Sequence, residues 1–430
     1  MLIFVDKITE RLIYTLDFIF KDRGILYELT NDWIYFSKNE SQKNRLIYSD
    51  KYDETILSIS PATVLFDEAI FEYSLTKKLF LKEECLAFDK ILDPLASIFF
   101  VLTRMEEYTV KQRDMHDRFE ARNSVLHKFS WLHKVICDRW SEDIISFIEE
   151  NLNINLNKTT IQTTLIPSFD IDNTFAFQWK DGLRKLLGKW KDKIRKDSLR
   201  IEARINFEAG KIKDPFDTFD EIKKVKTQGF ETKIFWLLGE KSKYDKNISR
   251  NDIRHQALIQ EMSKFAEIGL HPSYESNKST FYLKNEHHLL NKILNSEVKT
   301  SRQHFLKMTF PVTYSTLIAQ GFTDDYSLGF ADEIGFRAGT SRAFYFFDLL
   351  KNVPTEFKIH PFAYMDGTLN YYLKLSPEES KVKIKELFDE VKQFGGDFIF
   401  IWHNETISEF GTWKNWKAVF DYTLTLKNEI

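Results

Sequence analysis

Acidic and imidazole side chains follow two apolar segments of this chain at the points where those segments end. Asp170 and Asp172 come directly after the β-branched and apolar run 163–169, and their spacing of two directs both to one side of an extended chain. The fully apolar run 398–402 ends at His403. Carboxylates and imidazoles brought together can bind a divalent metal, and one that is not a ligand can act as a general base or acid. The acidic pair would equally serve to cap a following helix, so both roles are open at this point.

Two other segments add imidazole and guanidinium groups. His271 stands between Gly269 and Pro272 after a predicted helix, and Arg302 and His304 share a short extended segment. Taken singly, His271 is more often a structural histidine, and Arg302 could form a surface ion pair. Taken together, two aspartates and three histidines near segment ends form a ligand set for a divalent cation such as zinc, with groups to spare for acid and base chemistry.

The segments that must position these groups alternate between strand and helix patterns after residue 158. Parallel strands need helical crossovers, so this alternation predicts an α/β fold with a parallel sheet or barrel. In such folds the chemistry gathers at the carboxyl ends of the strands. The expected strands are 163–169, 233–238 and 398–402, and the expected helices are 216–225, 252–267 and 377–394.

The first part of the chain has a different pattern, in which short aromatic runs mix with helices. The polar, Asn-rich stretch 151–158 separates the two patterns, so we predict an N-terminal domain over residues 1–157 and a second domain over 158–430. Helical spacing covers 12–20, 94–108 and 131–152, and strand-like runs cover 3–5, 34–36 and 63–66.

Composition and charge restrict the class of protein. Of the 430 residues, 43% are hydrophobic and 15% aromatic, so the chain can bury sizeable cores and is not a disordered or low-complexity protein. The net charge of −3 provides no general attraction for nucleic acid. Two cysteines, the absence of a basic and then apolar leader, and the absence of an apolar run of about 18 residues favour a cytoplasmic protein without a disulfide framework or a membrane span.

One segment departs from this charge balance. Residues 180–200 contain nine basic residues against three acidic ones, with Leu186, Leu187 and Trp190 at helical spacing. A basic amphipathic helix of this kind can lie on an anionic membrane surface. It can also be the solvated face of an insertion, and the sequence leaves both interpretations open.

The order of these segments resembles the polysaccharide deacetylase family, the NodB-homology group of carbohydrate esterases. More closely, it resembles a subgroup found in Bacteroidetes in which an N-terminal domain of unknown function precedes the deacetylase-like domain. The resemblance implies a distorted (β/α) barrel preceded by a smaller α+β domain. It rests on Phe169-Asp170-Ile171-Asp172, on residues 269–273, 301–304, 325–330, 335–340 and 401–403, and, for the N-terminal domain, on residues 93–100 and 104–108.

The same resemblance implies an activity and roles for individual residues. The activity is the metal-dependent removal of acetyl groups from N-acetylated sugars of a polysaccharide or glycan precursor. Asp170 is expected to be the general base, Arg302 to orient it, and His403 to be the general acid. Zinc is the expected metal, with Asp172, His271 and His304 as its ligands. The residues expected to contact the sugar are Trp402, Glu405 and Arg337, and further aromatic platforms could come from Trp413, Trp416, Phe336 and Tyr345.

This sequence departs from the family pattern at two places. Ile171 separates the two acidic residues that are usually adjacent, and Glu275 occupies the place of a second histidine after His271. We expect Glu275 at the surface and His304 to complete the metal coordination. Two alternatives remain at this point. One is a non-catalytic glycan-binding or scaffold protein on a degenerate deacetylase fold, and the other is a hydrolase of O-acetyl esters, which pass through the same kind of oxyanion.

Overall fold

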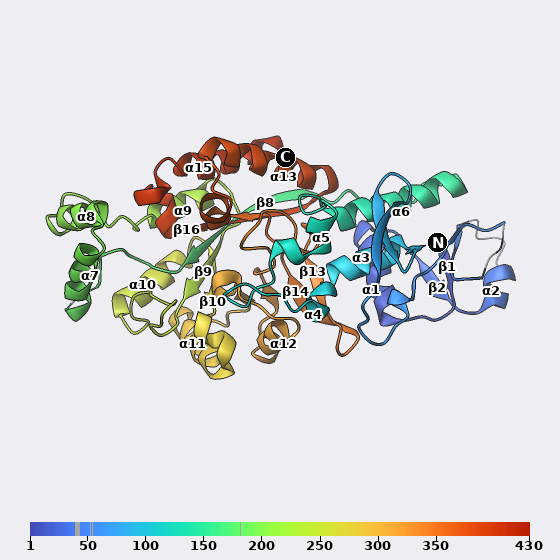
Figure 1. Ribbon diagram of the computed structural model, residues 1–430, viewed down its shortest axis with the longest axis horizontal. Helices are drawn as coiled ribbons and strands as arrows, with labels where there is room; N and C mark the ends of the chain where they lie inside the picture. Colours follow the sequence, from blue (N-terminus) through green and yellow to red (C-terminus); the bar gives the residue numbers. More distant parts are fainter. Residues whose placement is uncertain (39–43, 52, 54, 181) are drawn as a thin grey trace.

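The computed structural model describes residues 1–38, 44–51, 53, 55–180 and 182–430. The molecule is elongated, with the N-terminal elements at one end and a large sheet with its helices toward the other (Figure 1). The N-terminal region, residues 1–157, contains β1 Leu2–Val5, α1 Glu10–Ile19, β2 Glu28–Thr30, α2 Trp33–Lys38, β3 Arg45–Tyr48, β4 Ser58–Ile59, β5 Leu75–Leu79, β6 Glu84–Phe88, β7 Ile91–Leu92, α3 Pro94–Leu102, α4 Glu106–Thr109, α5 Val125–Lys128 and α6 Ile136–Leu152. The C-terminal region, residues 158–430, contains β8 Thr163–Ile171, α7 Leu183–Ile194, α8 Ser198–Glu208, α9 Phe219–Thr227, β9 Lys233–Leu237, α10 Ile253–Met262, β10 Glu267–His271, α11 Thr280–Leu294, β11 Thr300–Ser301, α12 Val312–Ala319, β12 Asp324–Asp325, β13 Phe344–Asp348, β14 Val353–Ile359, β15 Tyr364–Met365, α13 Pro377–Phe394, β16 Gly396–His403, α14 Asn404–Ile407 and α15 Lys417–Thr425.

A nine-stranded sheet forms the centre of the C-terminal region. Its strand order is β13-β14-β12-β11-β10-β9-β8-β16-β15, and the neighbouring strands are parallel except for β13 and β14. Because the parallel strands point the same way, their carboxyl ends lie along one edge of the sheet. The predicted α/β fold with a parallel sheet is therefore confirmed. The sheet remains open, with β13 and β15 as its two edge strands.

The two faces of the sheet bury different side chains. In β16, Ile399 and Ile401 belong to an inner apolar cluster that also receives Ile166 of β8 and Phe235 of β9. The residues of β16 that alternate with them, Phe398, Phe400 and Trp402, belong to the larger outer core, where Trp402 packs edge-on against Phe420 of α15. Successive side chains of a strand point to opposite faces. The alternation that places Ile399 and Ile401 inside the curve of the sheet therefore carries on to His403.

The N-terminal region contains two smaller sheets. One has the order β2-β1-β3-β4 and the other has the order β5-β6-β7. Helices α3 and α6 pack against each other and join this region to the outer core of the large sheet. A mixed α/β arrangement is thus observed on both sides of residue 157, and the position of the predicted domain boundary stays a prediction.

Buried ion pairs tie the two regions together. Nε and Nη2 of Arg337 donate to the two oxygens of the Glu107 carboxylate, and the Nε–Oε1 distance is 2.9 Å. Arg342 contacts Asp138, with 3.1 Å between Nη1 and Oδ1. Each of these four side chains is at most 7% exposed. An unpaired charge at such a depth would be strongly destabilising, so these contacts fix how the two regions meet.

Several predicted elements of the N-terminal region differ from the structure. The run 34–36 lies in helix α2 and the run 63–66 forms a single turn of 3-10 helix, so both strand predictions are wrong. Asp32 explains the first, because its carboxylate accepts hydrogen bonds from the backbone N–H groups of Ile34 and Tyr35 and so caps a helix there. The predicted helix 94–108 is interrupted at Arg104, whose φ is 55°.

Helix α7 and helix α8 form a hairpin at the end of the molecule opposite the N-terminal sheets (Figure 1). In the described part of the chain, no helix is both long enough and apolar enough to cross a membrane.

Candidate active site

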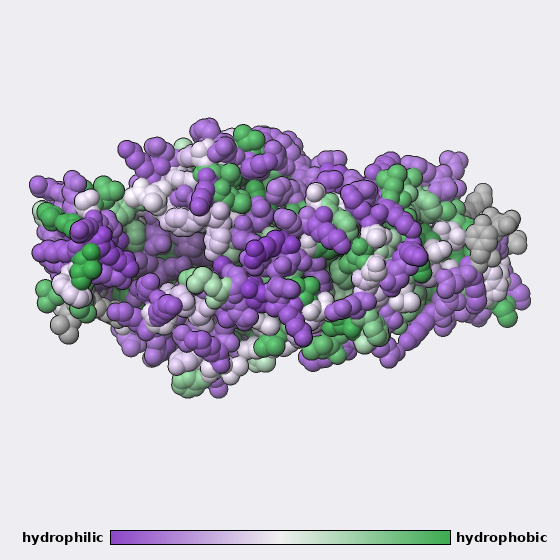
Figure 2. All heavy atoms as spheres, in the orientation of Figure 1, coloured by the Kyte–Doolittle hydropathy of each residue, from purple (hydrophilic) through white to green (hydrophobic). Residues whose placement is uncertain are grey.

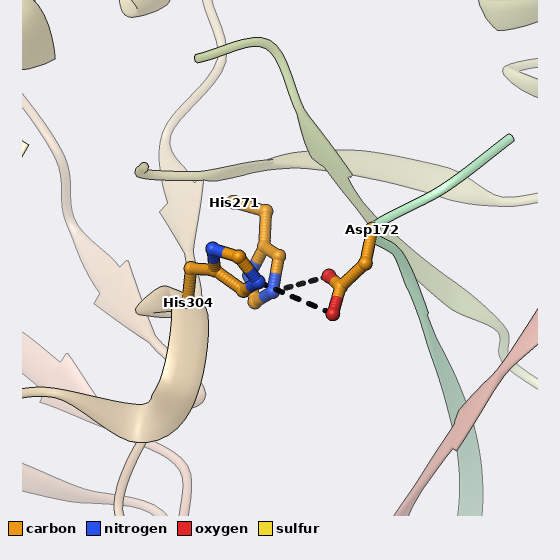
Figure 3. A group of neighbouring side chains, drawn as sticks. All are labelled: Asp172, His271 and His304. Carbon is orange, nitrogen blue, oxygen red and sulfur yellow. Dashed lines mark ion pairs between the residues drawn. The ribbon is translucent and has the colours of Figure 1, made fainter. Parts of the chain in front are cut away.

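Asp172, His271 and His304 converge at the carboxyl edge of the large sheet (Figure 3). Asp172 follows β8, His271 ends β10, and His304 follows β11, so three parallel strands that are far apart in the sequence deliver them. The Asp172 Oδ1–His271 Nε2 distance is 3.1 Å, and the Asp172 Oδ2–His304 Nε2 distance is 3.2 Å. One ligand atom from each residue lies within 4.8 Å of the others.

The hydrogen bonds around the two imidazoles determine which nitrogens face Asp172. Nδ1 of His271 donates to the carbonyl oxygen of Arg302, and Nδ1 of His304 donates to Oδ1 of Asp245 at 2.8 Å. In the neutral rings each Nε2 therefore offers a lone pair. Both Nε2 atoms face the Asp172 carboxylate, and the buried Oδ1 of Asp172 accepts no hydrogen bond from any described residue.

When neither Nε2 carries a proton, three acceptor groups are aimed at one point, which is the arrangement that a divalent cation satisfies. Carboxylate-to-histidine contacts like that between Asp245 and His304 are common behind metal ligands, because they fix the tautomer and the ring orientation. Burial lowers the pKa of His304, but the charge of Asp172 and the hydrogen bonds to Asp172 and Asp245 outweigh it and raise the pKa to about 9. The raised pKa of His304 means that a positive charge beside these carboxylates is favourable. The residues fit zinc or a similar metal.

Asp170 lies beside this cluster, 3.8 Å from His271, and is bound by Arg302. Arg302, which is fully buried, donates from Nη1 to Asp170 Oδ1 at 2.9 Å and from Nη2 to Ser168 Oγ at 2.9 Å. Its Nε donates to the carbonyl oxygen of Tyr326, and its guanidinium lies 4.3 Å from the centre of the Phe235 ring. Every side of the guanidinium is occupied, so the Asp170 carboxylate is presented in one orientation.

His403 occupies the position on β16 that pairs in register with Asp170 on β8. Its Nδ1 lies 2.9 Å from Oδ1 of the fully buried Asp366, and its Nε2 points toward Asp172, 3.7 Å from Oδ2. Burial lowers the pKa of His403, but Asp366, Asp172 and Asp170 outweigh it and hold the pKa well above its usual value. These carboxylates favour the protonated form of His403, whose Nε2 faces the cavity.

These side chains line a cavity of about 270 Å³. Its remaining walls are largely apolar and aromatic, and Glu405 lies among them. Burial raises the pKa of Glu405. The positive φ angles of Phe305 and Leu306, 61° and 53°, place strained backbone directly in this wall. The lining consists of Arg118, Asp170, Asp172, His271, Gln303, His304, Phe305, Leu306, Met365, Asp366, Gly367, Tyr371, Tyr372, His403, Glu405, Thr406 and Trp413.

The N-terminal region contributes one wall of this cavity through Arg118. Its side chain is held by Asp114, with 2.7 Å between Nε and Oδ2, and it reaches across to the C-terminal region. There it donates to the carbonyl oxygen of Phe305 at 3.1 Å and to the hydroxyl of Tyr372 at 2.9 Å. The cavity is therefore built from both regions of the chain.

Two of the residues expected to contact a sugar are placed elsewhere. Trp402 is fully buried on the outer face of β16, because it alternates with His403. Arg337 is buried in its ion pair with Glu107 and does not line the cavity. Of the other expected platforms, Trp413 lines the cavity, whereas Phe336 and Trp416 are buried outside its lining and Tyr345 borders a different cavity near α1. These sugar-contact predictions are wrong for Trp402 and Arg337.

Glu275 does not reach the metal-binding cluster. It pairs with Lys278 on the surface, with 2.8 Å between Oε2 and Nζ. His304, and not Glu275, lies together with Asp172 and His271, and its role as a metal ligand stays a prediction.

Sequence reasoning missed Asp366, Asp245 and Arg118. Asp366 follows β15, a strand of only two residues, which is too short to give a period. The one available signal is the Asp366-Gly367 pair, which is typical of a chain reversal. Asp245 and Arg118 lie in irregular segments whose sequence gives no sign of their position.

Comparison with known proteins gives three findings. Residues 1–153 match the sequence profile of DUF7033, a family of unknown function. A search of curated proteins finds no match. Similar solved structures include a protein provisionally assigned as a polysaccharide deacetylase from Mycobacterium smegmatis (10% identity, TM-score 0.39, covering 62% of this chain and 86% of that chain). They also include PuuE allantoinase (10%, 0.39, 63% and 85%) and a polysaccharide deacetylase from Bacillus cereus (10%, 0.30, 62% and 88%). At this similarity no residue role passes from those proteins to this chain.

Proposed function

We propose that the chain is a metal-dependent hydrolase that removes acetyl groups from N-acetylated sugars of a polysaccharide or glycan precursor. One observation carries this proposal. A cluster of acceptors that suits a divalent cation, Asp172, His271 and His304, shares a cavity with an Arg-bound carboxylate, Asp170, and a protonated imidazole, His403. These are the parts that hydrolysis of an unactivated amide requires.

The metal, when bound, polarises the amide carbonyl and lowers the pKa of a water molecule. Asp172, His271 and His304 would hold it. Asp170 accepts the proton of the attacking water, and Arg302 keeps its carboxylate aimed at that water. His403 donates the Nε2 proton to the departing amine, and the negative charge of Asp366 keeps that proton in place until it is needed. Tyr371 and Trp413 offer flat apolar surfaces suited to a sugar ring.

Acetate release from an N-acetylglucosamine oligomer tests the proposal. We expect activity from the purified full chain, its loss on removal of metal with a chelator, and its return on adding zinc. Asp170→Asn and His403→Ala should each lower kcat by about 10²-fold or more, the range for removing a general base or acid. Glu275→Gln, at the surface, is the matched control and should retain full activity.

The outcomes separate this proposal from its alternatives. Full activity in both Asp170→Asn and His403→Ala would reject the assigned roles. A protein that purifies without stoichiometric metal and binds the oligomer without releasing acetate would be a non-catalytic glycan-binding protein. Acetate release from an O-acetylated sugar alone would reassign the reaction from amides to esters.

A further inference from the structure

The hairpin of α7 and α8 exposes an apolar face. Leu186, Leu187, Trp190 and Ile194 of α7 each keep between 57% and 65% of their surface exposed. Leu186, Trp190 and Ile194 follow one another at intervals of four, so they form a stripe along one side of the helix. In a helix of a globular protein such a stripe normally packs against the core, but here it is on the outside of the molecule.

Basic residues flank this stripe. Among the described residues, Lys191, Lys193, Arg195 and Lys196 form no ion pair with an acidic side chain, whereas Lys185 and Lys189 are partly neutralised by Glu208. The field of these cations extends beyond the hairpin. The charge of Arg195 and then burial lower the pKa of Lys191, and Lys246, Arg200 and Lys241 add to the effect. Figure 2 shows apolar and hydrophilic atoms side by side over this end of the molecule.

A groove connects the hairpin to the candidate active site. A second cavity, of about 560 Å³, is lined by Leu199 and Arg200 of α8 at one side and by Tyr371, Glu405 and Trp413 at the other. The last three residues also line the cavity that contains the metal-binding cluster. A chain-like molecule bound at the cluster would thus have a path along the surface toward the hairpin.

We propose that the α7–α8 hairpin binds the surface of an anionic lipid bilayer. The apolar stripe would enter the boundary between headgroups and acyl chains, and the basic residues would contact the anionic headgroups. A second copy of this chain fits the hairpin less well, because it would bring the same excess of positive charge against itself. Binding to the bilayer does not depend on the proposed reaction, although the groove would place the active site next to molecules held at that surface.

Flotation of the full chain with lipid vesicles tests the proposal. One set of vesicles contains phosphatidylcholine alone, and the other contains about a third phosphatidylglycerol. Two double variants address the two components: Leu187→Ser with Trp190→Ser for the apolar stripe, and Lys191→Glu with Arg195→Glu for the charge. Leu350→Ser, at a residue that is 68% exposed on another surface, and Lys226→Glu, on the exposed side of α9, are the matched controls.

The wild-type chain should float with the anionic vesicles and remain behind with the neutral ones. The charge variant should lower the apparent partition constant by about tenfold or more, since each lysine or arginine near an anionic surface contributes about fivefold. The apolar variant should lower it by about the same factor, because it removes apolar surface that would be buried in the bilayer. The controls should stay within about twofold of the wild type. Acetate release from a soluble oligomer should be unchanged in both double variants, which keeps this test separate from that of the proposed function.

Three results would overturn the proposal. The first is the absence of wild-type co-flotation with anionic vesicles. The second is equal flotation of the wild type and the Leu187→Ser, Trp190→Ser variant, which would show that the apolar stripe does not enter the bilayer. The third is a dimer in light scattering that Trp190→Ser abolishes, which would identify a second copy of the chain as the occupant of this face. Circular dichroism melts of each variant confirm that the fold is intact.

Discussion

Two buried clusters of charge in this protein are organised in opposite ways. Between the regions, Glu107 is surrounded by cations, because Arg337 contacts both of its oxygens and Arg104 donates to Oε1 at 2.9 Å. At the carboxyl edge of the sheet, Asp172 faces two imidazoles that offer lone pairs. The first cluster is complete in charge, because Glu106 also contacts Arg104 and two carboxylates therefore face two guanidiniums. The second directs a carboxylate and two imidazole nitrogens to a common point, which suits a divalent cation and the chemistry proposed above.

Breaking the complete cluster should have the largest effect. Burial raises the pKa of Glu107, but Arg337 and Arg104 outweigh it and hold the pKa below its usual value. Glu107→Ala leaves both guanidiniums buried without this carboxylate. We expect the free energy of unfolding to fall by about 3–5 kcal/mol, measured by urea denaturation.

The pair of Glu275, which is partly exposed, and Lys278, which is exposed, provides the control, and Glu275→Ala should change the free energy of unfolding by about 1 kcal/mol or less. Equal losses in the two variants would remove the distinction between the clusters.

Changing a residue that supports the second cluster, that of Asp172, His271 and His304, should have an intermediate effect. The effect should be on metal affinity and not on folding. Asp245→Asn replaces the carboxylate that accepts from His304 by a neutral amide. We expect metal affinity, measured by competition with a chromogenic chelator, to fall by about 10–100-fold.

Asp324 is the matched control because it makes the same contact with His360, 2.7 Å between Oδ1 and Nε2, away from the cluster. Asp324→Asn should leave metal affinity unchanged. An equal loss in both variants would show that the effect is not transmitted through His304.

The smallest expected effect is a shift in pH dependence. His403 is the imidazole of the site that is not itself a metal-ligand candidate, and Asp366 makes the largest favourable contribution to its raised pKa. In the proposed reaction His403 is the general acid and works only while protonated, so we expect activity to be lost as the pH rises through this pKa. Asp366→Asn removes the charge and lowers the pKa.

The high-pH limb of the kcat/KM profile should therefore move to lower pH by about one unit or more. A profile with an unchanged high-pH limb and a lower maximum would instead mean that Asp366 only positions the ring.

The sequence could predict the convergence at the sheet edge because parallel strands place their carboxyl ends together. Asp172, His271 and His304 are separated by up to 132 positions, yet each follows or ends a strand of the same sheet. The same logic misplaced Trp402, because it considered the end of β16 without the alternation of its two faces. A buried tryptophan next to a site histidine on a strand belongs to the opposite face.

Other parts of the site and fold had no local signal. Asp366 depends on a two-residue strand, and Arg118 enters the cavity through contacts with Phe305 and Tyr372 that join distant parts of the chain. In the N-terminal region, the aromatic run 34–36 has the composition of a strand, but the cap by Asp32 determines a helix. The cytoplasmic location and the domain boundary at residue 157 stay predictions.

The placement of Arg118 and of the buried pairs across the regions has a practical consequence for anyone who expresses this protein in parts. A fragment that starts at residue 158 would keep all of the metal-ligand candidates, but Arg337 and Arg342 would lose Glu107 and Asp138, and the cavity would lose a wall. Such a fragment should be less stable than the full chain, and its cavity should be more open where Arg118 is missing. We therefore expect the N-terminal region to be needed for the stability of the C-terminal region and for the shape of its cavity.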